Sequence, residues 1–174
     1  MDYQGNWRDI FQNWEALAHS YPEFIESMIH NFLNDPTFDG YNLYRATKRG
    51  FAWAVIEPDD PWSFIGYWGD HQIIYLLKFL EFAENHYPIK LVQYFNQELF
   101  VYANVPYKIK SYSEILKNPK DTIDFDHELD QKINQQKTIL GADGALLLSQ
   151  TQEICKVNLM EKLLATVSKP TGRY

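Results

Sequence analysis

Residues 6–14 read Asn-Trp-Arg-Asp-Ile-Phe-Gln-Asn-Trp, and they open the first predicted element of the chain. From here apolar side chains recur at the i, i+4 and i+7 positions, as Ile10, Trp14 and Leu17. Side chains with this spacing share one face of a helix, so the sequence predicts a helix over residues 7–19.

A tight junction and a second helix follow. Residues 20–23 read Ser-Tyr-Pro-Glu, in which a serine suits a helix cap and a proline suits the first helical turn. A helix is therefore predicted over residues 22–34. Its wide apolar stripe consists of Phe24, Ile25, Met28, Ile29, Phe32 and Leu33. Two helices joined so closely form a helical hairpin.

The rest of the chain is predicted to be mainly α-helical, with one or two short strands. Residues 35–69 show no clear periodicity and are predicted to be a long, aromatic-rich packed loop. A third helix over 71–86 is apolar around most of its circumference, which predicts burial between neighbours. The later predictions are a helix after Pro88, a strand over 99–105, a helix stop at Leu140–Gly141, a strand or hairpin over 145–157 and a helix over 158–167. No internal repeat is visible in the sequence.

Composition excludes several classes of protein. The 174 residues suffice for one domain, and a net charge of −7 argues against a nucleic-acid partner. No stretch reaches the about 18 consecutive apolar residues of a membrane span, and no secretory signal is expected from residues 1–5. The single Cys155 leaves no intramolecular disulfide, so a cytoplasmic location is expected.

Two clusters combine aromatic rings with charged and amide side chains, at residues 7–14 and 68–72. Flat rings and directional hydrogen-bonding groups are what a protein needs to hold a sugar ring. The simpler interpretation is structural: Arg8 and Asp9 would be a surface pair at a helix start, and Asp70 would cap the next helix.

Other candidate sites are weaker. Residues 124–130 alternate oxygen ligands as a calcium loop does, but they lack the glycine at the sixth position, and Gln135 replaces the final glutamate. An acidic helix start explains them better. Paired carboxylates at Asp59-Asp60 lie between prolines and fit a turn better than acid–base chemistry. The sequence predicts no metal site, no cofactor and no catalytic residue.

The two clusters together resemble the cellobiose and chitobiose phosphorylase family and large uncharacterised bacterial relatives of it. Residues 7–13 are similar to that family's Phe-Arg-Asp-x-x-Gln-Asp segment, and residues 69–74 to its Asp-Asp-His-Leu-Trp-Leu segment. The resemblance implies an (α/α)6 barrel of helical hairpins around a sugar pocket, in which an inverting glycosidase or phosphorylase acts on oligosaccharides.

Carried over by resemblance, the substrate-binding residues are Arg8, Asp9, Gln12, Trp68, Asp70 and His71. Arg8 and Asp9 would bind sugar hydroxyls, supported by Gln12. The sequence departs from the family at Asn13 and Gly69, each of which replaces an aspartate. The family's general acid lies in a downstream Trp-Asn-Asp segment, and no tryptophan follows Trp68 here.

The chain is therefore expected to be a slice of such a barrel, with two or three hairpins and no complete active site. Residues 1–105 would form the partial barrel, and residues 106–174 a polar insertion and helical segment of the same domain. Such a slice should expose apolar helix faces and self-associate. The alternatives are a non-catalytic helical module that binds sugars or a partner protein, and a structural helical domain with every tryptophan in its core.

Overall fold

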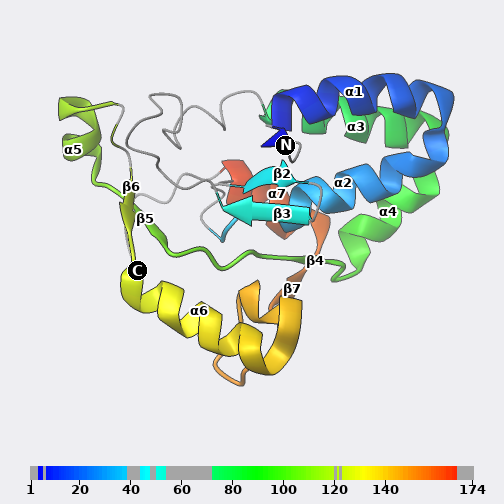
Figure 1. Cartoon of the computed structure of the whole chain (residues 1–174). Coiled ribbons are helices and arrows are strands. Elements are labelled where there is room, and N and C mark those ends of the chain that lie inside the picture. The colour runs from blue at the N-terminus through cyan, green and yellow to red at the C-terminus, as the bar shows by residue number, and fades with distance from the viewer. Residues whose placement is uncertain are drawn as a thin grey trace.

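The computed structural model describes residues 4–5, 7–38, 44–47, 50–53, 72–119, 121 and 123–167, and side chains within 10–38, 74–119, 121 and 123–165. These residues are mainly helical (Figure 1). The helices are α1 (Trp7–Ser20), α2 (Ile25–Asn34), α3 (Gln72–His86), α4 (Pro88–Asn96), α5 (Tyr112–Lys117), α6 (His127–Leu140) and α7 (Leu159–Val167). The strands are β1 (Gln4–Gly5), β2 (Tyr44–Thr47), β3 (Gly50–Trp53), β4 (Phe100–Val101), β5 (Tyr107–Ile109), β6 (Ile123–Phe125) and β7 (Lys156–Val157).

The first helical hairpin is confirmed, with two corrections. A 3-10 turn, Pro22–Phe24, joins α1 to α2, and its N-cap is Tyr21, because Ser20 still belongs to α1. The buried stripe of α1 is also rotated from the predicted one. Leu17 is exposed, whereas Phe11 and Ala18 are completely buried.

The second hairpin, α3 and α4, has the same junction as the first. Tyr87 caps α4 with φ −141° and ψ 58°, and Tyr21 caps the first junction with φ −138° and ψ 74°. A proline follows each tyrosine as the first helical residue, where its missing N–H costs no hydrogen bond. Each hairpin therefore turns at a Tyr-Pro pair.

The two hairpins stack in parallel, α3 beside α1 and α4 beside α2 (Figure 1). The contacts between α1 and α3 advance together along both helices, since three successive pairs each lie 63 residues apart. The pairs are Gln12–Tyr75, Glu15–Lys78 and His19–Phe82. Between α2 and α4 the partners lie 64 residues apart, in the pairs Glu26–Lys90 and His30–Tyr94. The chain thus contains a structural repeat that its sequence does not display.

The main core lies between these four helices. Its buried side chains are Ile10, Phe11, Ala18, Ile25, Met28, Ile29, Phe32, Leu33, Leu76, Phe79, Ala83, Tyr94, Phe100 and Leu159. The burial predicted for α3 between its neighbours is correct only in part, because Ile74 and Leu77 are 55% and 56% exposed, whereas Leu76, Phe79 and Ala83 are buried.

The strands are short, antiparallel and more numerous than the one or two predicted. β1, β2 and β3 form one sheet, β4 pairs with β7, and β5 pairs with β6. The prediction of an irregular loop over 35–69 is wrong at β2 and β3, and residues 39–43, 48–49 and 54–69 lie outside the described residues.

The C-terminal half of the chain packs against the two hairpins. β7 pairs with β4, and α7 packs against α4. The predicted helix stop is confirmed: α6 ends at Leu140, and Gly141 takes φ +66°, a backbone conformation that suits glycine. The acidic helix start is confirmed too, since the Asp126 carboxylate accepts a hydrogen bond from the Leu129 N–H. Among the described helices, none combines the length and apolar character needed to cross a membrane.

Candidate functional site

The first cluster of predicted sugar-binding residues lies in the first two turns of α1, and the second cluster precedes α3 in the sequence. Arg8 and Asp9 lie in the first turn of α1, but their side chains are outside the described set. Trp68, Asp70 and His71 lie wholly outside the described residues. Gln12 is the one predicted site residue whose side chain is described.

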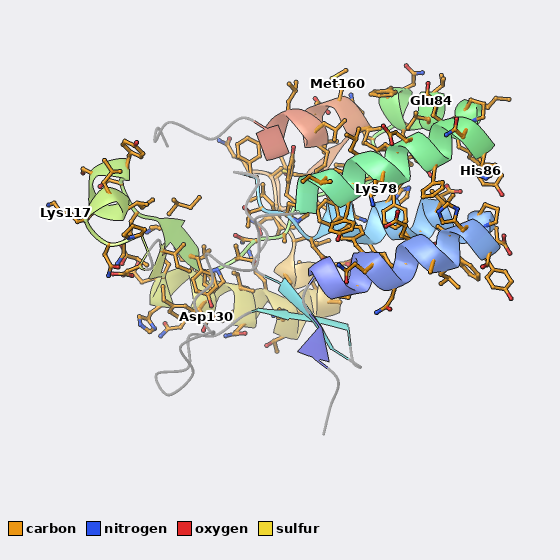
Figure 2. All side chains as sticks on the ribbon, turned by 90° about the horizontal axis from the view of Figure 1, so that it is seen from above. Lys78, Glu84, His86, Lys117, Asp130 and Met160 are labelled. Carbon is orange, nitrogen blue, oxygen red and sulfur yellow. The ribbon has the colours of Figure 1, made fainter. Side chains whose placement is uncertain are left out.

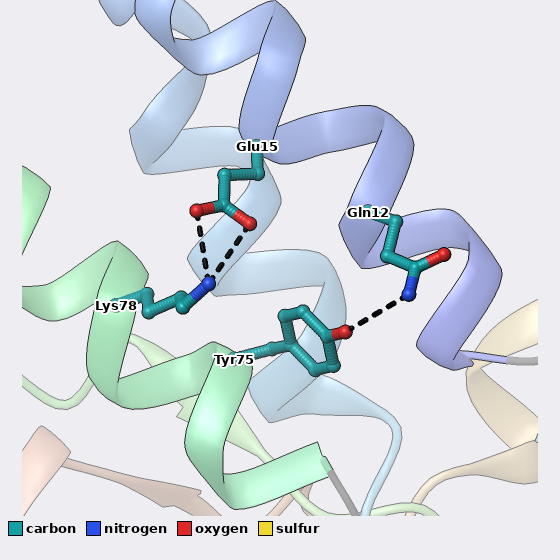
Figure 3. A network of polar contacts seen from close by, with 4 residues as sticks. All are labelled: Gln12, Glu15, Tyr75 and Lys78. Carbon is teal, nitrogen blue, oxygen red and sulfur yellow. Dashed lines mark hydrogen bonds and ion pairs between the residues drawn. The ribbon is translucent and has the colours of Figure 1, made fainter.

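Gln12 lies on the seam between α1 and α3 (Figure 3). Its amide Nε2 donates a hydrogen bond to the Tyr75 hydroxyl at 3.3 Å. The Tyr75 ring stacks on the buried Phe11 ring, with the planes 3° from parallel and the centroids 5.3 Å apart. This stacking fixes the orientation of the ring, so the hydroxyl of Tyr75 is held in place beside the Gln12 amide.

One helical turn further along, an ion pair bridges the same two helices. The Lys78 ammonium lies 2.9 Å and 3.0 Å from the two carboxylate oxygens of Glu15 (Figure 3). Because both side chains are partly exposed, such a pair contributes at most about 1 kcal/mol, so its main effect is to fix the register of the seam. Sequence analysis missed Tyr75 and Lys78 as neighbours of Gln12, since only the parallel stacking brings them together.

A cavity of about 190 Å³ lies at the other end of the hairpins, near the Tyr-Pro junctions. Its lining consists of Glu23, Ile25, Glu26, Ala83, Tyr87, Lys90 and Tyr94. Glu26 forms an ion pair with Lys90 at 3.4 Å. Burial raises the pKa of the Tyr94 hydroxyl, and the carboxylate of Glu26 raises it further. The cavity contains none of the predicted site residues.

The third polar cluster surrounds Lys162 on α7, which is completely buried. Its ammonium donates hydrogen bonds to the Pro36 carbonyl oxygen at 3.1 Å and to the Val101 carbonyl oxygen. It also lies 3.8 Å from the centroid of the Tyr102 ring, within cation–π distance. Lys162 therefore ties α7 to the chain just beyond α2 and to β4.

Asp35, the residue before Pro36, is buried beside this lysine. Its Oδ2 atom has no hydrogen-bond partner among the described residues. Burial raises the pKa of the Asp35 carboxyl to about 8, although the charge of Lys162 acts in the opposite direction. Burial likewise lowers the pKa of the Lys162 ammonium to about 7. Because both side chains are buried, the cluster lies inside the fold, where it joins α7 to the segment that follows α2.

The buried carboxyl predicts a pH dependence of stability. The folded-state pKa of Asp35, about 8, lies above its usual value of 3.8, so the folded protein keeps a proton that the unfolded chain has lost. The free energy of unfolding should therefore fall as the pH rises from 5 to 7, by about 2 kcal/mol from this group. The shift of Lys162 has the opposite sign and acts at higher pH, between about 7 and its usual 10.5.

Urea unfolding of the wild type and Asp35→Asn at pH 5 and pH 7 measures this effect. The decrease between the two pH values should be smaller in Asp35→Asn. Asp143→Asn, at an exposed carboxylate after α6, should retain the wild-type decrease. The same decrease in all three proteins would show that Asp35 ionises normally.

The classification of this protein rests on its fold and on the geometry of its side chains. The chain matches no protein-family model and no curated protein. Among the described residues, no group of three or more His, Cys, Asp or Glu side chains could hold a metal ion. The described part defines a mainly α-helical protein built on two stacked helical hairpins.

Proposed function

We propose that this chain supplies part of an oligosaccharide-binding pocket in a larger barrel of helical hairpins, and that it has no complete active site of its own. The proposed sugar-binding residues are Arg8, Asp9 and Gln12 in the first cluster and Trp68, Asp70 and His71 in the second. The single Cys155 fits a reducing compartment, and we propose the cytoplasm as its location.

The parallel packing of α1 and α3 is the observation that supports this proposal. Because three successive contacting pairs are each 63 positions apart, the two helices run in the same direction and begin at the same end of the stack. The first cluster opens α1, and Asp70 and His71 directly precede Gln72, the first residue of α3. The order of the chain therefore favours a common pocket for both clusters, whereas antiparallel helices would have separated them.

The described polar groups at this seam suit a sugar. Gln12 is exposed, and it offers an amide donor and a carbonyl acceptor beside a tyrosine hydroxyl. The partly buried Trp14 lies two positions along the chain and packs edge to face on the buried Phe11 ring, with the ring centroids 5.9 Å apart, so Trp14 is the ring that a ligand could reach. Paired amide and hydroxyl groups beside rings are the elements that bind a pyranose.

Titration of the chain with cellobiose and chitobiose, followed by ligand-observed NMR or calorimetry, tests this proposal. Loss of a hydrogen bond to a charged group costs about 1.5–3 kcal/mol, so Asp9→Asn and Asp70→Asn should each weaken sugar binding about tenfold or more. Glu84→Gln, near the opposite end of α3, is the matched control and should bind as the wild type does. No binding of either sugar, or equal loss in the control, would contradict the proposal.

A module that binds a partner protein is the second candidate. It is favoured by the large apolar side chains that α4 exposes, Ile89, Val92 and Phe95. Retention of a protein partner by a chain that binds neither sugar would favour this candidate over the first.

A further inference from the structure

The Tyr-Pro junctions allow the two hairpins to be superposed residue by residue. Aligning Tyr21-Pro22 with Tyr87-Pro88 sets equivalent positions 66 residues apart. The pairs Gln12–Tyr75 and Glu26–Lys90, which are in contact, are 63 and 64 positions apart. A residue of the first hairpin therefore contacts the near side of the second hairpin, and not the residue that is equivalent to itself. The alignment thus distinguishes two sides of each hairpin. The forward side is the one on which the following hairpin packs, and the backward side is the one that packs on the preceding hairpin.

The forward side of the first hairpin is covered by the second. Phe11 stacks on Tyr75, Glu26 pairs with Lys90, and Glu23 lines the cavity between the hairpins. These residues come from α1, the 3-10 turn and α2, and they face α3 and α4. Together they form the surface of the first hairpin on which the second hairpin packs.

The equivalent side of the second hairpin is exposed and apolar at Leu77 and along α4. On α3 the positions equivalent to Gln12, Glu15 and His19 are the polar Lys78, Glu81 and Asn85. Adding 66 to positions 11, 23 and 26 gives Leu77, Ile89 and Val92. These side chains are 56%, 75% and 58% exposed, and we call them the forward face. Where the first hairpin has two glutamates, the second has isoleucine and valine. Figure 2 shows α7, with Met160, on the side of α3 remote from α1, so α7 borders this region.

The backward side of the first hairpin is its structural complement. At the junction end of the stack, Lys90 pairs with Glu26 of the first hairpin, and Tyr87 lines the cavity between the hairpins. Subtracting 66 gives Tyr21 and Phe24, which are 52% and 48% exposed, and we call them the backward face. The position that holds a lysine in the second hairpin holds a phenylalanine here.

We propose that a second copy of this chain docks its backward face onto the forward face, so that its first hairpin continues the stack. The internal ion pair Glu26–Lys90 has Val92 and Phe24 at the equivalent positions, so the contact between copies would be apolar where the internal one is charged. Phe24 and Val92 are both exposed in each chain. Burying them removes apolar surface from water, which is the main driving force of association.

The contact is heterologous, because the two copies use different faces. A dimer of this kind still has one free forward face and one free backward face at its two ends. Association therefore continues as the concentration rises and does not stop at a dimer. A symmetric dimer through the forward faces alone would instead bury only Leu77, Ile89 and Val92. The two arrangements differ in whether Phe24 matters.

Sedimentation velocity of the full chain over a range of concentrations, at about 0.15 M salt to screen its net charge of −7, tests this proposal. The wild type should rise above the 20.6 kDa monomer mass. Val92→Glu and Phe24→Glu should each sediment as monomers, because each places a carboxylate in every contact. Ile139→Glu, at an 82% exposed position on α6 outside both faces, should associate as the wild type does.

Mixing the two monomeric variants gives the sharpest result. The intact backward face of Val92→Glu fits the intact forward face of Phe24→Glu, so the mixture should form a dimer of twice the monomer mass and nothing larger. Circular dichroism confirms that the variants are folded, and Ile89→Glu, at a 75% exposed position, repeats the forward-face test. A monomeric wild type, an associating Phe24→Glu variant or a mixture without dimers would each overturn the proposal.

Discussion

Replacing Lys162 with methionine should lower the free energy of unfolding by about 2–5 kcal/mol, because each buried carbonyl left without its donor costs about 1–3 kcal/mol. The ammonium is completely buried and donates hydrogen bonds to the carbonyl oxygens of Pro36 and Val101. Methionine fills a similar volume but leaves both carbonyls without this donor, whereas Asp35, with a pKa of about 8, stays protonated at pH 7. Urea unfolding at pH 7 measures the loss.

Two variants separate the causes. Lys156→Met removes an exposed lysine from β7, close in sequence, and should change the stability by less than about 0.5 kcal/mol. The double variant Lys162→Met, Asp35→Asn should lose about as much as Lys162→Met at pH 7, because Asp35 is protonated there and leaves no unpaired charge. Recovery in the double variant would show that the Asp35 carboxyl is ionised. A single Lys162→Met variant as stable as the wild type would show that the cluster does not hold α7.

Truncating Phe11 to alanine should also cost about 3–5 kcal/mol, because it leaves a large cavity in the core. The ring is completely buried, with the rings of Phe32, Tyr75 and Phe79 at centroid distances of 5.0, 5.3 and 5.3 Å. These neighbours come from α2 and α3, so the cavity would open where both hairpins meet. Thermal and urea unfolding, followed by far-UV circular dichroism, measure the loss.

Leu17→Ala is the matched control on the same helix. Leu17 is 40% exposed, so its truncation removes fewer packed atoms and should cost well below half as much. Equal losses in the two variants would show that Leu17 is packed as tightly as Phe11, against the burial that the structure gives them. The two substitutions therefore also test which face of α1 is buried.

Local patterns predicted most of the helices. The periodicity of α1 and α2, the proline that starts α4 and the glycine that ends α6 are signals carried within a few residues of each element. β2 and β3 were missed because each is only four residues long and their sheet is completed by β1, about 40 residues earlier in the chain. A partner so distant in sequence leaves no local trace.

Contacts between elements were beyond what the sequence could predict. The stripe of α1 is rotated toward Phe11 because the helix has two neighbours, α2 and α3, and the buried arc faces both. A lysine on a short amphipathic helix is ordinarily solvent-facing, so nothing in the residues around Lys162 indicates its burial. Of the candidate sugar-binding residues, Gln12 alone has described contacts, and its partner Tyr75 follows only from the stacking.

The parallel order of the hairpins has an electrostatic consequence. Peptide dipoles add along a helix and give its C-terminus about half a negative charge. α2 and α4 run in the same direction, so their negative poles point to the same end of the stack, whereas an antiparallel pair would oppose each other. The Lys162 ammonium binds the Pro36 carbonyl, two residues beyond the end of α2, where this field is favourable for a cation. The macrodipole thereby offsets part of the cost of burying an ammonium group.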